Sequence, residues 1–287
     1  MKSCRVRKIT SFLLVGLLLL GAALVSGCSK KDASDTAKNN TSGLTGTLTI
    51  AGSTSVQPFS EVLAEKLMAS NKGLQINVQG GGSSVGVEAA ISGAAGLGSV
   101  SRALTADEKS KGLVDTIIAL DGIAIVVHPS NTVKALKTED IMNIYLGNVK
   151  NWKDVGGPDS LITVVSREDG SGTREAFTSL VMNKKDIIKT AIIQNSTGAV
   201  ATTVAGDNNA IGYVSLSSIS QKVKAVYIDG TAPTEANVKA GSYKLQRPFT
   251  YVTKGAPTGL SKAFIDFVLS PEGQKIIVDE GAVSISK

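Results

Sequence analysis

Short apolar runs alternate along the chain with longer segments in which apolar residues recur every three or four positions. The first pattern is typical of strands and the second of amphipathic helices. Because alternating strands and helices build sheets that are mainly parallel, the sequence predicts an α/β fold. The expected strands span residues 48–51, 75–79, 116–120, 123–128, 162–166 and 225–228, and the expected helices span 56–68, 85–92, 138–145, 174–181, 260–269 and 271–279.

Two of the extended runs, Ile123–Pro129 and Pro248–Thr253, are bounded by Gly or Pro and separate groups of polar motifs. Gly and Pro commonly mark the places where a chain leaves one structural unit. These runs are therefore expected to carry the chain between two lobes. The predicted division places residues 45–126 and 249–287 in lobe I and residues 127–248 in lobe II.

Residues 1–27 have the pattern of a signal peptide: a basic head precedes the apolar run Phe12–Leu24. That run is shorter than the roughly 20 residues of a membrane-spanning helix. Val25–Cys28 resembles a bacterial lipobox, so Cys28 is expected to carry palmitate and to anchor the mature chain outside the cytoplasm, on the cell membrane. An uncleaved anchor and secretion with an incidental cysteine are the alternatives. Residues 28–44 are expected to form a flexible polar tether.

Charge and composition narrow the possible chemistry. The 287 residues include 30 basic and 24 acidic ones, and loss of the leader lowers the formal net charge from +6 to +2. No basic cluster interleaved with aromatic residues remains, which argues against a nucleic-acid partner. One histidine and two cysteines exclude the usual zinc sites, and no cofactor or metal is expected. The chemistry is left to hydroxyls, carboxylates, guanidinium groups and backbone amides.

A turn of Gly, Ser and Thr at the start of a helix occurs three times, in residues 51–58, 80–86 and 166–173. In the first turn, Thr54 or Ser55 is expected to cap the helix. Helix N-termini offer unpaired amide donors and partial positive charge, which attract anions. If the turns converge, they surround a tetrahedral oxyanion and Arg167 adds a guanidinium fork. Any one turn taken alone is more typical of a well-capped helix.

Gly82–Gly86 also fits G-x-S-x-G, the nucleophile elbow of α/β hydrolases, with Ser84 as the nucleophile. The base would have to be His128, the only histidine in the chain. It follows Ser84 more closely than such an enzyme would place it, because more of the sheet normally separates the two residues. The protein is therefore expected not to be an enzyme, with a secreted serine hydrolase kept as an alternative.

The order of these motifs resembles that of the phosphate-binding proteins of bacterial high-affinity phosphate ABC importers. The resemblance rests on the lipobox and on residues 51–55, 82–84, 120–124, 151–152 with 156–157, and 167–173. It implies a type II periplasmic-binding-protein-like fold, with two α/β lobes joined by two crossing strands that close over phosphate. It also implies delivery of phosphate to the membrane permease subunits of an ABC importer, a task that suits a monomer.

The resemblance further implies which residues hold the anion. Asp169 is expected to orient Arg167 through a salt bridge. The implied phosphate-binding residues are Ser53, Thr54, Ser55, Ser83, Ser101, Arg167, Ser171, Gly172 and Thr173.

One departure from the family concerns selectivity. Many members carry an aspartate that accepts the proton of phosphate and repels sulfate, whereas Gly98–Arg102 has Ser101 at that position. Asp121 is a candidate for the missing acceptor, or else an ordinary turn residue. Arg102 either adds a second positive contact or pairs with a surface carboxylate. A binding protein for sulfate or molybdate therefore stays open beside phosphate capture, as does a surface adhesin that uses the fold as a scaffold.

Overall fold

The computed structural model describes residues 43–286, so the predicted leader, Cys28 and most of the predicted tether lie outside it. Within this range, no helix is both long and apolar enough to cross a membrane. The buried apolar side chains of the described residues form four clusters, which fall into two groups by their residue ranges. One group, which defines lobe I, lies in residues 44–119 and 249–282. The other, which defines lobe II, lies in residues 120–245 with Val283. This division falls several residues before the boundary expected after residue 126.

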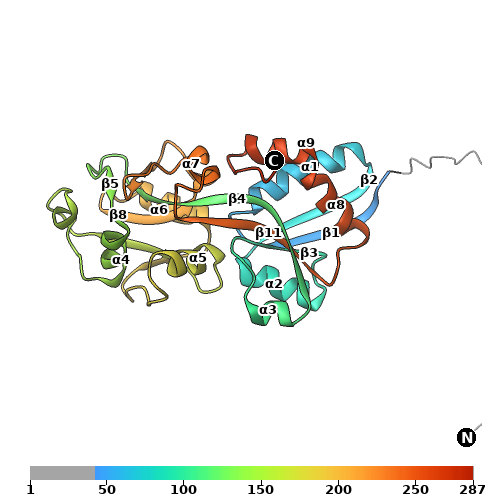
Figure 1. Cartoon of the computed structure of the whole chain (residues 1–287), viewed down its shortest axis with the longest axis horizontal. Coiled ribbons are helices and arrows are strands. Elements are labelled where there is room, and N and C mark those ends of the chain that lie inside the picture. Colours follow the sequence, from blue (N-terminus) through green and yellow to red (C-terminus); the bar gives the residue numbers. More distant parts are fainter. Residues whose placement is uncertain (1–42, 287) are drawn as a thin grey trace, which may run out of the picture. The chain divides into compact units, whose positions relative to one another are not determined.

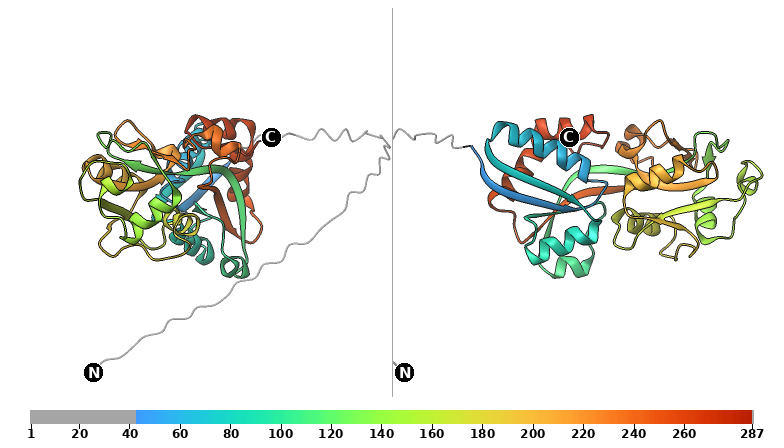
Figure 2. Two further views of the ribbon diagram at one scale, coloured as in Figure 1. Left: turned by 60° about the vertical axis from the view of Figure 1, so that its left-hand side comes forward. Right: turned by 180° about the vertical axis from the view of Figure 1, so that it is seen from behind.

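Lobe I is built on a parallel arrangement in which β1 lies between β2 and β3. Helices α1, α8 and α9 cover one face of this sheet, and α2 and α3 lie on the other (Figures 1 and 2). Ile50, Leu63 and Phe264 are fully buried between the sheet and the first three of these helices. The elements are β1 (Thr45–Gly52), α1 (Gln57–Ser70), β2 (Gly73–Gly80), α2 (Ser83–Ser92), β3 (Leu97–Val100), α3 (Ala106–Ser110), α8 (Gly259–Leu269) and α9 (Pro271–Asp279).

Two long antiparallel strands, β4 (Leu113–Val127) and β11 (Gln246–Lys254), run from one lobe into the other (Figure 1). Up to Gly122, β4 pairs with β11, and from Ile123 onward it pairs with β8 in lobe II. The sequence predicts two strands here, separated at Asp121. The strand is continuous because β11 pairs with residues 113–122 across that position.

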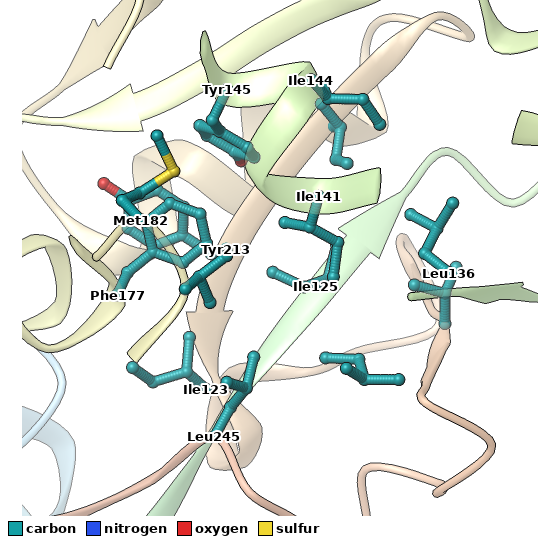
Figure 3. Close-up of a cluster of buried hydrophobic side chains, with 14 of the residues drawn as sticks. Ile123, Ile125, Leu136, Ile141, Ile144, Tyr145, Phe177, Met182, Tyr213 and Leu245 are labelled. Atoms are coloured by element: carbon teal, nitrogen blue, oxygen red, sulfur yellow. The ribbon is translucent and has the colours of Figure 1, made fainter. Parts of the chain in front are cut away.

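Lobe II has β8 between β4 and β6, with β7 at the far edge. The main core of lobe II lies under α4 and α5 (Figure 3). In it, the ring of Phe177 stacks on that of Tyr213 at 4.2 Å, and Tyr145 packs tilted against both. The elements are β5 (Ala135–Leu136), α4 (Thr138–Leu146), η1 (Trp152–Val155), β6 (Thr163–Arg167), α5 (Gly172–Leu180), β7 (Ile192–Gln194), α6 (Thr197–Ala205), β8 (Ala210–Ser215), η2 (Leu216–Ser218), β9 (Lys224–Ala225), β10 (Tyr227–Ile228) and α7 (Glu235–Lys239).

The predicted α/β fold is confirmed, and each predicted helix is present with ends that differ by a few residues at most. The predicted strand 225–228 is instead two short strands with different partners. Helix α6 (Thr197–Ala205) was not predicted, because its Thr, Val and Gly residues are poor helix formers. It forms because Val200 and Val204 are buried against β8 in a second core of lobe II.

Candidate functional site

Three buried hydroxyls from the two lobes meet next to helix N-termini. The Oγ of Ser55, in the turn before α1, lies 3.1 Å from Thr173 Oγ1 and 2.8 Å from Thr197 Oγ1. Thr173 is in the first turn of α5 and Thr197 begins α6. Each of these three residues is at most 2% exposed. We call Ser55, Thr173 and Thr197 the hydroxyl cluster; it joins lobe I to lobe II.

The predicted cap of α1 was wrong: the N-cap residue is Val56, and no side chain caps the helix. The Oγ of Ser53 accepts hydrogen bonds from the backbone N–H groups of Ser55 and Val56, at 3.2 and 3.4 Å. Neither Thr54 nor Ser55 caps the helix. Ser53 thus has a structural role, and the Ser55 hydroxyl is left for the hydroxyl cluster. Thr54 Oγ1 accepts a hydrogen bond from the backbone N–H of Thr197 at 3.3 Å, so it too contacts lobe II.

The second and third turns face each other across the lobes. Ser83 Oγ accepts a hydrogen bond from the Ser101 backbone N–H at 3.1 Å and lies 3.4 Å from Ser101 Oγ. Gly172 packs against this pair so closely that an added Cβ would collide with Ser83 Oγ. Ser171 Oγ caps α5 by accepting from the backbone N–H of Arg174. The approach of the two lobes at this point therefore requires a glycine.

Arg167 is almost fully buried, at 1% exposure, at the end of β6. Its Nε and Nη2 donate to the Glu168 carboxylate at 2.8 and 2.7 Å, and its Nη1 donates to Thr197 Oγ1 at 3.2 Å. The predicted salt bridge to Asp169 was wrong. The Asp169 side chain is 95% exposed and pairs with Arg174, because it follows Glu168 and points away from the buried guanidinium.

A second buried arginine, Arg247, was missed by the sequence analysis. It lies opposite Asp121 in the β4–β11 pairing, and its Nε and Nη2 donate to Asp121 Oδ2 at 3.0 and 2.9 Å. The other oxygen of Asp121 accepts from Ser215 Oγ and from the backbone N–H of Leu216. Both carboxylate oxygens of Asp121 thus accept hydrogen bonds from protein groups. Asp121 therefore holds Arg247 in position and is not a free acceptor for a ligand. The sequence offered one indication of this residue: Arg247 directly precedes Pro248, where the predicted crossing run begins.

Burial opposes ionisation of both partners in this pair. It raises the pKa of the Asp121 carboxyl, although the nearby Arg247 charge acts in the opposite direction. Burial also lowers the pKa of Arg247, and the positive charge of Arg167 lowers it further. Both guanidinium groups donate to hydroxyls of the hydroxyl cluster, so their positive charges lie close together within the protein.

Arg102 pairs with carboxylates, but these are the buried Glu108 and the half-buried Glu175 and not the surface carboxylate that one of the two alternatives expected. Its Nη1 and Nη2 each donate to Glu108 at 2.8 Å, and its Nε lies 2.5 Å from an oxygen of Glu175. Glu175 belongs to α5, so this ion pair connects the lobes. A backbone hydrogen bond from Ser84 N–H to the carbonyl of Gly170 also crosses between them.

The described residues supply donors for an anion and do not pair Ser84 with the histidine that a serine hydrolase would need. The hydrogen bonds in residues 43–286 join His128 Nδ1 to Ser130 Oγ at 2.7 Å and not to Ser84. The same residues contain no group of three or more His, Cys, Asp or Glu side chains that could hold a metal ion. A buried site of hydroxyls, guanidinium groups and helix N-termini favours binding of a small oxyanion.

The chain is similar to several known proteins along nearly its whole length. The family model of the PBP superfamily domain matches residues 37–272. The phosphate-binding protein PstS of Bacillus subtilis (strain 168) is 36% identical, over 97% of this chain and 94% of that protein. The corresponding PstS of Borreliella burgdorferi is 28% identical, over 83% of this chain and 90% of that protein.

Solved structures agree with these sequence matches. A Clostridium perfringens protein crystallised with bound phosphate is 42% identical and superposes with a TM-score of 0.82, over 84% of this chain and 100% of that one. An ABC-type phosphate transport receptor from Vibrio cholerae is 38% identical with a TM-score of 0.71, over 82% of this chain and 99% of that one.

Proposed function

The chain belongs to the PBP superfamily, among the phosphate-binding proteins of ABC importers, and from this membership we propose that it captures inorganic phosphate between its lobes and delivers it to a membrane permease. The observation that carries the proposal is the hydroxyl cluster, where Ser55 of lobe I meets Thr173 and Thr197 of lobe II beside Arg167. An anion held there contacts both lobes only when they are together. Phosphate binding therefore stabilises the closed arrangement.

The phosphate contacts that we propose differ in part from the predicted set. Ser55, Thr173 and Arg167 stay in it as direct donors, Thr197 joins them, and Thr54 lies at their edge. Backbone amides at the starts of α1, α2, α5 and α6 complete the donor set. The remaining predicted residues position these groups or cap the helices: Ser53, Ser83, Ser101, Ser171 and Gly172.

Further parts of the proposal concern the cell and the chemistry. We propose that the chain is a lipoprotein anchored at Cys28 to the extracytoplasmic side of the membrane, since Val25–Cys28 resembles a lipobox. We also propose that it acts as a monomer and without catalysis. The contact of His128 with Ser130 supports the last point, because the only histidine in the chain is then not paired with Ser84 as its base.

Equilibrium dialysis of the wild-type protein against labelled phosphate tests the proposed function. The wild type is expected to bind one phosphate per chain. Ser55→Ala removes a hydrogen bond to a charged ligand and is expected to weaken binding about tenfold. Ser92→Ala is the matched control, because its hydroxyl bonds only to carbonyls of its own helix. Absence of phosphate binding by the wild type would refute the proposal.

Sulfate is the second candidate ligand, because Ser101 replaces the expected aspartate and Asp121 is already paired with Arg247. Neither residue then presents a free carboxylate that would repel a fully ionised anion. Dialysis of phosphate in the presence of a large excess of sulfate separates the two. If phosphate binding is undiminished under these conditions, the hydroxyls enforce the selectivity for phosphate. If sulfate displaces phosphate, the protein binds tetrahedral oxyanions in general.

A further inference from the structure

Arg247 holds an unusual position for an arginine: it is 3% exposed and lies on β11, where this strand crosses between the lobes. Asp121, directly opposite on β4, accepts one hydrogen bond from Arg247 Nε and one from Nη2. A guanidinium group has five N–H donors, so this pairing leaves several of them for other partners. The crossing strands thus place a fixed, oriented cation between the lobes.

The remaining contacts of Arg247 point at the hydroxyl cluster. Its Nη1 donates to Thr173 Oγ1 at 2.7 Å and to the carbonyl of Ser101 at 3.2 Å. Its Nη2 donates to Ser55 Oγ at 3.3 Å. One guanidinium group therefore contacts hydroxyls from both lobes, and these are hydroxyls to which we assign phosphate contacts.

Arg167 approaches the same cluster from the other side, through Thr197. Two buried cations beside one group of hydroxyls repel each other, and burying them is unfavourable unless charge of the opposite sign is near. Glu168 and Asp121 each offset one of them. The donors that these carboxylates leave free face the hydroxyl cluster, where an anion would attract both guanidinium groups at once.

We propose that Arg247 is a second phosphate-contacting arginine supplied by the crossing strand, and that Asp121 is the residue that positions it. The inference rests on the proposed function and adds to it. The phosphate is held between two guanidinium groups, one from lobe II and one from the crossing, in place of an arginine and a free aspartate. Because Arg247 touches Ser55 and Thr173 together, it also links occupancy of the site to contact between the lobes.

Calorimetric titration with inorganic phosphate tests this assignment on four variants of the full chain. Arg247→Met removes the cation and is expected to weaken binding at least thirtyfold. Arg247→Lys keeps the charge but loses the planar guanidinium fork, so phosphate binding is expected to weaken about tenfold. Asp121→Asn leaves Arg247 in place but holds it less firmly, so phosphate binding is expected to weaken about threefold to tenfold. Lys254→Met, on the exposed end of the same strand, removes a matching charge and is expected to stay within twofold of wild type.

Thermal unfolding with and without phosphate separates ligand contact from a bracing role. If Arg247 contacts phosphate, the phosphate-induced rise in Tm is smaller in Arg247→Lys than in the wild type at the same phosphate concentration. If Arg247 only braces the crossing, the ligand-free Tm falls while the phosphate-induced rise persists, and the proposal is overturned. Binding of phosphate by both Arg247 variants within twofold of the wild type would overturn it as well. Failure of the wild type itself to bind phosphate would instead contradict the proposed function.

Discussion

Replacement of Arg167 by alanine is the perturbation whose size follows most directly from the structure. Glu168 holds Nε and Nη2, so the guanidinium group faces the hydroxyl cluster mainly through Nη1, which donates to Thr197 Oγ1. Hydrogen bonds between a charged donor and a charged acceptor contribute about 1.5–3 kcal/mol each. Loss of one such bond costs about 2 kcal/mol, so the Kd for phosphate is expected to rise about thirtyfold or more.

A second consequence of Arg167→Ala comes from its partner. Glu168 is left without its cation, and its negative charge then repels the bound anion. The double variant Arg167→Ala/Glu168→Ala removes this repulsion, so its Kd is expected to lie at least threefold below that of the single variant. Together with the single variant Glu168→Ala and the wild type, these two variants form a cycle that measures the coupling between Arg167 and Glu168. The assay is calorimetric titration with phosphate.

The control for this experiment is Lys153→Ala, which removes an exposed cation of lobe II that pairs with Asp159. Surface ion pairs contribute little, and the Kd is expected to stay within twofold of wild type. A folded Arg167→Ala variant that binds phosphate as tightly as this control would refute the reasoning, because Arg167 would then lie outside the site.

Two further predictions concern packing and pH. Gly172→Ala brings a Cβ into Ser83 Oγ and is expected to weaken phosphate binding at least tenfold, because it holds the lobes apart. The control Gly198→Ala places its Cβ in open space and is expected to leave the Kd for phosphate unchanged. Equal effects of the two variants on the Kd in calorimetric titrations would contradict this prediction. Burial raises the pKa of Glu108, but hydrogen bonds from Arg102 and the backbone outweigh it and lower this pKa below 4.5. The resulting stability is present above pH 4.5 and is lost as the pH falls through the lowered pKa. The Tm gap between wild type and Glu108→Gln should therefore narrow below pH 4.5, and a constant gap would count against the argument.

The elements that the sequence predicted well are those whose pattern is local. Helix α9 (Pro271–Asp279) has the predicted bounds because Pro271 starts it and Ser270 caps it. Helix α6 and strand β8 could not be predicted in this way, because Gly, Thr and Val give neither a clear helical nor a clear strand period. Contacts between distant segments decide their structure.

The site shows the same division between local and distant information. Arg167 and Thr173 stand in a motif that can be recognised in the sequence, so their place at the candidate site could be predicted. Arg247 lies far from that motif, and only the pairing of β11 with β4 brings it to Ser55 and Thr173. The choice between Glu168 and Asp169 as partner of Arg167 depended on which side chain points inward, which adjacent carboxylates do not reveal in sequence.

A crystal structure of the protein grown with phosphate tests the central claim most directly, namely that phosphate is bound where the two lobes meet. The expected result is one phosphate within hydrogen-bond distance of Arg167 and of hydroxyls from both lobes, Ser55 and Thr173 among them. A phosphate that contacts only one lobe, or that lies away from the hydroxyl cluster, would contradict the account.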